Sequence, residues 1–216
     1  MLEKNIAPTI HVDLRTSFPK IRDQGSRPLC LAFSASDVNS NVNSVSEALS
    51  VEYLAYHAYL YETHTDYNRG LSIHSITHAL KNDGQPTENE HPYDYQATTP
   101  KIPLTNFSNL FHCMNDSTGL SVDDIFNQLN LGLPIILGIN LSHSFFSPTY
   151  PYVIAEDGDN LGGHAVIAVG SGELDCGTRC ILIRNSWGLA WGEKGHSWLT
   201  ENYLSNRLIT SLTLSK

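Results

Sequence analysis

The chain is poor in cysteine and in charged side chains. Only four of its 216 residues are cysteine, and charged residues make up 16%. Four cysteines are too few for a disulfide scaffold to organise a chain of this length. The 41% of hydrophobic residues instead indicate a globular protein that buries a core of its own.

Basic residues are scarce as well. The sequence has 13 lysines and arginines against 22 acidic residues, which gives a net charge of −9. We find no Lys/Arg cluster of the kind that binds phosphate groups, so nucleic acid is excluded as a partner. No apolar run approaches the roughly 20 residues that span a bilayer, so no membrane partner is expected.

The first residues, 1–5, contain no apolar stretch suited to a signal peptide. The sequence therefore predicts a cytoplasmic protein, or one delivered by a non-classical secretion route.

Helical patterns come first along the chain and strand patterns follow. Apolar residues recur at helical spacing after Pro28, which suits a first helical turn, and Ser72 and Ser121 are placed as helix caps. Short β-branched runs between turn residues predict strands later in the chain. The helices are expected over 31–45, 51–61, 72–82 and 121–131, the strands over 135–139, 164–169, 180–184 and 208–214, and a long connection over 82–120. This order favours an α+β fold with two lobes.

One set of side chains meets the needs of a nucleophilic thiol. Cys30 is at a predicted helix start, where the helix dipole helps to ionise the sulfur. His164 opens an apolar strand and can complete a thiolate–imidazolium pair, and Asn185 ends another strand. Gln24 lies six residues before the cysteine and carries an amide N–H that can reach an oxyanion.

The spacing of the two strands predicts how His164 and Asn185 meet. If strands 164–169 and 180–185 form a hairpin centred between residues 174 and 175, then Val169 faces Cys180 and His164 faces Asn185. Opposed residues share one face of a sheet, so the asparagine would hold the imidazole ring.

Three segments resemble those of the papain-like (C1-type) cysteine peptidases. Residues 24–34, with Gln24 and Cys30, resemble the glutamine-to-nucleophile segment of that family. Gly162-Gly163-His164-Ala165-Val166 is similar to its histidine motif, and Arg184-Asn185-Ser186-Trp187-Gly188 to its asparagine motif. The order Gln, Cys, His, Asn also matches, with 134 positions between cysteine and histidine.

The resemblance implies a papain-like fold, with a helical N-terminal lobe, an antiparallel β-barrel-like C-terminal lobe and the active-site cleft between them. It implies one peptidase domain over 1–216, with the helical lobe at roughly 24–110 and the β-rich lobe at roughly 111–216 plus segment 8–20. Only 12 residues precede Asp13, near which such a domain typically begins, so no inhibitory pro-segment is expected in this chain. In lacking a signal peptide and a pro-segment, the sequence resembles bacterial members of the family.

The resemblance also implies the role of each site residue. Cys30 would be the nucleophile, His164 the general base and then acid, and Asn185 the residue that orients the imidazole ring. Gln24 and the Cys30 backbone N–H would form the oxyanion hole. The expected reaction is acyl transfer through a thioester to water, without a metal or an organic cofactor.

Three further residues are expected to contact the substrate or shield the site. Gly70 resembles the glycine whose backbone pairs with an extended substrate. Trp187 would cover the His–Asn hydrogen bond. Gly163 stands where many relatives have a projecting residue, which predicts an open pocket and a preference for small or glycine-rich substrates.

Two departures from the family pattern lie beside the nucleophile. Arg27 stands where relatives carry the first cysteine of a common disulfide, and Leu31 where they carry a tryptophan. The first change fits a reducing compartment, and the second alters the packing beside the cleft.

The expected function is a cysteine endopeptidase with a protein or peptide substrate, in the role of a bacterial toxin or effector acting on a target-cell protein. A proteinaceous inhibitor or immunity protein would then occupy the cleft. An acyl transferase, ligase or amidase using the same site, and an inactive binding module, are the alternatives.

Two other groups of residues have the spacing of metal ligands. His74 and His78 lie four residues apart, but Ser75 stands where a zinc peptidase needs glutamate, so a solvated helix face is expected. Cys176 and Cys180 can be bridged, can bind a metal or can simply flank a turn, and the last is favoured.

Overall fold

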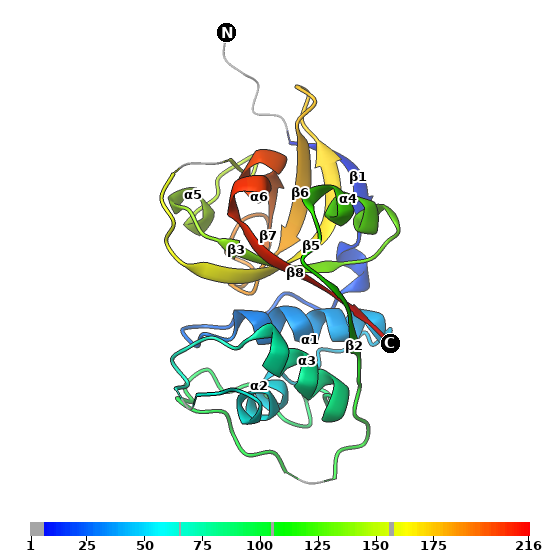
Figure 1. The fold of residues 1–216 in the computed structure, drawn as a ribbon, viewed down its shortest axis with the longest axis vertical. Coiled ribbons are helices and arrows are strands. Elements are labelled where there is room, and N and C mark those ends of the chain that lie inside the picture. Colours follow the sequence, from blue (N-terminus) through cyan, green and yellow to red (C-terminus); the bar gives the residue numbers. More distant parts are fainter. Residues whose placement is uncertain (1–6, 65, 105, 156–157) are drawn as a thin grey trace.

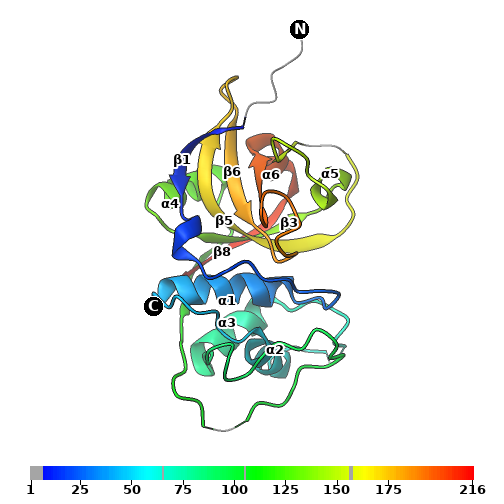
Figure 2. The same cartoon turned by 180° about the vertical axis from the view of Figure 1, so that it is seen from behind.

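The structure is a computed structural model that describes residues 7–64, 66–104, 106–155 and 158–216. Helices fill one lobe and a strand-rich sheet fills the other (Figure 1). The same division is visible from behind, where α1 lies between the sheet and the other two helices of its lobe (Figure 2). The expected two-lobed α+β fold is confirmed. The helices are α1 (Cys30–Val42), α2 (Val51–Leu60), α3 (Ile73–Asn82), α4 (Val122–Asn130), α5 (His143–Phe146) and α6 (Glu201–Arg207), and a short 3-10 helix covers Arg15–Ser17.

Serine side chains begin three of the helices. Ser50, Ser72 and Ser121 each accept a hydrogen bond from the backbone N–H three residues further along the chain. The Asp124 side chain in turn accepts a hydrogen bond from the backbone N–H of Ser121, which completes a capping box. The caps predicted at Ser72 and Ser121 are therefore confirmed, and they fix where α3 and α4 start.

Strands build the second lobe. In the main sheet the order is β2-β8-β3-β5-β6-β7-β4, and β1 pairs with β5 beside that path. β4 and β7 run parallel, and the other pairs of this sheet in the described residues are antiparallel. The strands are β1 (Thr9–Asp13), β2 (Met114–Thr118), β3 (Ile135–Asn140), β4 (Val153–Ile154), β5 (Gly163–Glu173), β6 (Arg179–Arg184), β7 (His196–Thr200) and β8 (Leu208–Ser215).

Segment 82–120 was expected to be a connection only, but it contains β2. Its sequence, Met-Asn-Asp-Ser-Thr, is mostly exposed and pairs with β8 at the end of the sheet. An exposed edge strand has no buried face, so it lacks the alternating hydrophobic pattern from which strands are predicted.

The predicted register of the β5–β6 hairpin is wrong. Ala168 pairs with Ile183 and Gly170 with Leu182, with a bulge between the two pairs. The turn is also centred later, since the Leu174 N–H bonds to the Thr178 carbonyl. The two cysteines do not flank this turn as expected, because Cys176 lies within it and Cys180 lies on β6. β6 ends at residue 184, so His164 has no partner on β6 and pairs with Ile139 of β3 instead.

A buried ion cluster joins the two lobes. Asp37 on α1 accepts hydrogen bonds from Arg22 at 2.5 Å and from Arg184 at the end of β6 at 2.8 Å. Burial alone would raise the pKa of Asp37, but the two guanidinium groups outweigh burial and lower it. Arg184 also donates to the Pro19 carbonyl. These bonds fix the end of β6, from which Asn185 projects.

His196 on β7 is buried and is expected to make the fold sensitive to acid. Burial and the charges of Arg184 and Arg15 lower its pKa to about 4. The unfolded chain takes up this proton near pH 6.5 and the folded chain only near pH 4, so stability falls as pH falls through that window. The expected loss is about 3 kcal/mol at pH 4 relative to pH 8.

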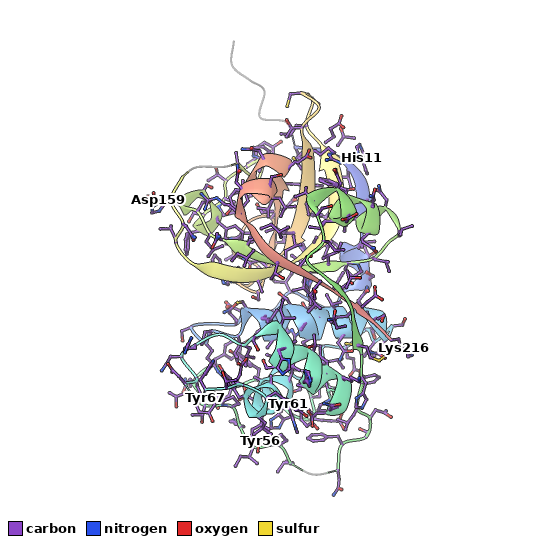
Figure 3. All side chains as sticks on the ribbon, in the orientation of Figure 1. His11, Tyr56, Tyr61, Tyr67, Asp159 and Lys216 are labelled. Carbon is purple, nitrogen blue, oxygen red and sulfur yellow. The ribbon has the colours of Figure 1, made fainter. Side chains whose placement is uncertain are left out.

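Replacing the histidine removes this contribution. His196→Asn should lose less stability than the wild type between pH 6.5 and 4, as measured by urea unfolding at several pH values. His11→Asn is the control, because His11 is an exposed histidine on β1 of the same lobe (Figure 3). Equal pH slopes in wild type and His196→Asn would contradict the assignment.

Among the described residues, no helix is both long and apolar enough to cross a membrane.

Candidate active site

Cys30 is the first residue of α1. The Leu29 N–H bonds to the Arg27 carbonyl at 2.8 Å in a tight turn, and Leu29 is the N-cap without a side-chain bond to the helix. Pro28 therefore lies before the helix, not in its first turn as predicted. The N–H groups of the first turn place positive dipole beside the Cys30 sulfur, which favours a thiolate.

His164 and Asn185 are joined by a hydrogen bond. His164 Nε2 lies 2.8 Å from Asn185 Oδ1, and both side chains are buried. The contact forms although the register was predicted wrongly, because Asn185 follows the last residue of β6 and is fixed by its own N–H bond to the Gly195 carbonyl. The bond occupies Nε2, so Nδ1 is the ring nitrogen left for proton transfer.

An aromatic group covers this hydrogen bond. The ring of Trp187 lies 4.7 Å from that of His164, centre to centre. Phe145, fully buried on α5, packs at 5.9 Å from His164 and at 5.5 Å from Trp187. Trp187 is thus placed against the imidazole as expected, and Phe145 is a neighbour that the sequence did not reveal. The rings of Trp187 and Phe145 exclude water from the His–Asn bond.

Burial disfavours each charge of the cysteine–histidine pair taken alone. Burial raises the pKa of the Cys30 thiol, although backbone hydrogen bonds from Ala165, Leu31 and Cys30 partly oppose it. Burial also lowers the pKa of His164 to about 4, against the raising effect of its bond to Asn185. The two charges have opposite sign and face one cleft, so ionisation becomes favourable when the proton moves from sulfur to imidazole and both charges form together.

Both polar atoms of the Gln24 side-chain amide form hydrogen bonds. Its Oε1 accepts a hydrogen bond from Ser186 Oγ at 2.6 Å, and its Nε2 donates to the Arg27 carbonyl at 2.9 Å. Its backbone N–H also bonds to the Ser186 carbonyl at 2.8 Å. The second N–H of Nε2 remains for an oxyanion beside Cys30. Ser186 lies in the asparagine motif, but its role in fixing Gln24 was not predicted.

One cleft of about 250 Å³ contains the predicted residues Cys30, His164, Gly70 and Gly163. Most of its wall is apolar. The other lining side chains belong to Leu31, Leu71, Ile73, Ile136, Ala165, Ile209, Thr210, Ser211 and Leu212, and Gly138 completes the wall. The cleft therefore offers an apolar pocket next to the thiol.

The described residues contain no group of three His, Cys, Asp or Glu side chains placed to hold a metal ion. The rings of His74 and His78 on α3 are tilted against each other with their centres 4.0 Å apart, and His78 Nδ1 contacts the His74 carbonyl. Exposed Cys176 contacts Thr178, and Cys180 is buried on β6.

This arrangement, a thiol at a helix start with a His–Asn pair and an amide donor, has the groups that acyl transfer by a cysteine nucleophile requires. The family model of the papain family cysteine proteases matches residues 8–213. The chain therefore belongs to the papain family of cysteine proteases.

Curated relatives agree with this membership. The chain is 31% identical over 133 residues to the thiol protease aleurain of Arabidopsis thaliana, covering 60% of this chain and 37% of aleurain. It is 26% identical to vignain of Phaseolus vulgaris, covering 94% of this chain and 57% of vignain. The chain thus spans about a third to somewhat over half of these two relatives.

Two solved structures show the same fold. Xylellain, a cysteine protease from Xylella fastidiosa, aligns with a TM-score of 0.78 and 22% identity over 100% of this chain and 89% of that chain. Digestive procathepsin L 3 of Tenebrio molitor aligns with a TM-score of 0.75 and 18% identity, covering 98% of this chain and 72% of that chain.

Proposed function

We propose that this chain is an endopeptidase that cleaves peptide bonds through a thioester on Cys30. The observation that carries the proposal is the 2.8 Å bond between His164 and Asn185, in a protein whose apolar cleft is lined by both His164 and Cys30. Activation of a thiol requires such an oriented imidazole.

The geometry supports the following steps. The Cys30 proton moves to Nδ1 of His164, and the thiolate attacks the carbonyl carbon of the peptide bond. The resulting oxyanion accepts hydrogen bonds from Gln24 Nε2 and the Cys30 backbone N–H. His164 then gives its proton to the leaving amine. Water, deprotonated by His164, hydrolyses the thioester and releases the thiol.

The cleft supports a preference for a large apolar side chain at the second residue upstream of the cleaved bond. Gly70 lines the cleft, where its backbone can pair with an extended peptide, and Ile136 and Leu212 contribute to the wall. Gly163 has no side chain to narrow the pocket. The volume and the apolar wall support leucine or phenylalanine instead of the small residues first expected.

A carboxylate placed in this pocket should reverse the preference. Thr210 lines the cleft and is half-buried, so Thr210→Glu leaves the new charge hydrated. We expect kcat/KM for leucine at this substrate position to fall about tenfold and that for arginine to rise. Paired fluorogenic peptides that differ only in this residue measure the change.

Thr210→Val is the matched control, because it keeps the methyl group that packs above Gly138. It should retain the preference for leucine. Unchanged preference in Thr210→Glu would show that the substrate side chain binds elsewhere.

Digestion of an unfolded protein such as casein tests the endopeptidase function itself. Internal cleavage products that depend on Cys30 support it. Products carrying an added amine or peptide instead of a new carboxylate would indicate the acyl transferase or ligase alternative. Binding of peptides without any product would indicate the inactive binding module.

The proposed biological role is that of a bacterial toxin or effector that cleaves a target-cell protein. The net charge of −9 supports a basic substrate or partner, and an inhibitor or immunity protein that covers the cleft would restrain the activity. Proteomic comparison of cells that express wild type or Cys30→Ala identifies the substrates. The effector role fails if no host protein is cleaved specifically by the wild type.

A further inference from the structure

A buried ion pair begins in the loop that precedes the nucleophile. Arg27 lies midway between Gln24 and Cys30, and its side chain extends into the helical lobe to Glu52 on α2. The two guanidinium nitrogens bond to the two carboxylate oxygens at 2.5 and 3.1 Å. Glu52 is fully buried and Arg27 is 8% exposed, so this is a two-pronged interaction shielded from water.

The carboxylate of Glu52 accepts four hydrogen bonds in all. Besides the two from Arg27, the backbone N–H of Asp94 donates at 3.2 Å and that of Lys101 at 2.9 Å. A buried carboxylate is tolerated when its oxygens are satisfied in this way. Glu52 is therefore a fixed anchor, to which three separate segments of the chain are attached.

Arg27 also fixes the loop through its own backbone carbonyl and through its contact with Tyr93. The Arg27 carbonyl is the acceptor for Gln24 Nε2 and for the Leu29 N–H. The guanidinium group lies over the ring of Tyr93 at 4.8 Å, and the Tyr93 hydroxyl donates to the Gln24 carbonyl at 2.8 Å. Any shift of the arginine therefore moves both the backbone and the side-chain amide of Gln24.

We propose that Arg27 is a positioning residue of the oxyanion hole, and that its bonds to Glu52 hold the Gln24 amide and the Cys30 N–H at the distance that the tetrahedral intermediate requires. This inference rests on the proposed function. Loss of one oxyanion donor typically costs about 10²- to 10³-fold in kcat. A donor that is displaced but not removed is expected to lower kcat by a smaller factor.

Three variants test the proposal. Arg27→Lys keeps the charge but cannot bond to both oxygens of Glu52 in the same two-pronged way. Arg27→Met breaks the pair. The third variant combines Arg27→Met with Glu52→Gln, which removes both charges. The N–H groups of Asp94 and Lys101 bond to different oxygens of Glu52, so the single amide oxygen of glutamine keeps only one of these two bonds.

The double variant avoids a buried unpaired carboxylate and so protects the fold. Arg179→Met is the control, because Arg179 pairs with Glu201 and Asp123 on the surface and does not line the cleft.

Three readouts separate positioning from a general structural role. The first is kcat and KM for a peptide amide, and the second is the inhibition constant of a peptide aldehyde, whose thiol adduct carries an oxygen in the oxyanion hole. The third is the alkylation rate of Cys30 by iodoacetamide, which forms no oxyanion. We expect kcat to fall about 10- to 100-fold in Arg27→Lys and in the double variant, with KM within about twofold.

The aldehyde inhibition constant should rise by a similar factor in these variants. The alkylation rate, and all values of Arg179→Met, should stay within about twofold of the wild type. Unchanged kcat in any folded Arg27 variant overturns the proposal, and so does an alkylation rate that falls in parallel with kcat. A wild type that does not cleave the peptide at all, although it is alkylated at Cys30, refutes the proposed function instead.

Discussion

Cys30→Ala is expected to abolish peptide hydrolysis, with kcat/KM falling at least about 10⁴-fold below that of the wild type. The reason is that no other described side chain in the cleft is a thiol. Without Sγ no thioester forms, and the oxyanion donors alone have no nucleophile to assist. Steady-state hydrolysis of a fluorogenic peptide with leucine as the second residue upstream of the cleaved bond measures the change.

Two controls accompany this variant. Cys176→Ala removes the exposed thiol at the β5–β6 turn and should leave hydrolysis unchanged. The melting temperature of Cys30→Ala should equal that of the wild type, because alanine fits the start of a helix. Hydrolysis that persists in Cys30→Ala would remove the cysteine from the mechanism.

His164→Ala is expected to lower kcat by about 10³- to 10⁴-fold and to change the pH dependence of alkylation at Cys30. In the wild type the imidazole takes the thiol proton, so the sulfur reacts with iodoacetamide at neutral and mildly acidic pH. In the variant, burial keeps the pKa of the Cys30 thiol above its usual value, and no imidazolium opposes this effect. The thiol then reacts only in the alkaline range.

Mass spectrometry of the alkylated Cys30 peptide from mildly acidic to alkaline pH measures this shift. His143→Ala is the matched control, because His143 is an exposed histidine on α5, one of the elements around the site. Its profile should follow the wild type. Identical alkylation profiles for His164→Ala and the wild type would show that the histidine does not activate the thiol.

Helices α1 to α4 could be predicted from local rules, whereas α5 and α6 were not predicted. Ser72 and Ser121 cap α3 and α4 through bonds within one turn, so the signal lies in four consecutive residues. The start of α1 was predicted from Pro28 and lies slightly later, because Leu29 is the N-cap and Cys30 the first helical residue. The family motifs then identified residues that line the cleft, because each motif is a short continuous segment.

The hairpin register could not be predicted, because it depends on contacts with a third strand. Gly170 lies next to the bulge, and a Cβ atom there would meet the Val12 carbonyl of β1 at 2.4 Å. The absence of a side chain at Gly170 permits the close approach of β1, which lies far earlier in the sequence. Simple pairing from the turn cannot include such a contact.

The interactions that hold the loop between Gln24 and Cys30 could not be predicted, for a similar reason. Arg27 and Glu52 are 25 residues apart, and Tyr93 lies 69 residues after Gln24. Each looks like an ordinary polar residue in its own segment. Only the packing of α2 against the loop brings them together, so sequence spacing carried no sign of the ion pair.

The central claim is that Cys30 carries the acyl group during peptide cleavage. The most direct test is to mix the wild type with a peptide nitrophenyl ester, stop the reaction with acid within milliseconds, and map the acylated residue by mass spectrometry. We predict the mass of the acyl group on the peptide that contains Cys30, at close to one group per active chain. Acylation at another residue, or turnover without any acyl group on Cys30, would contradict the claim.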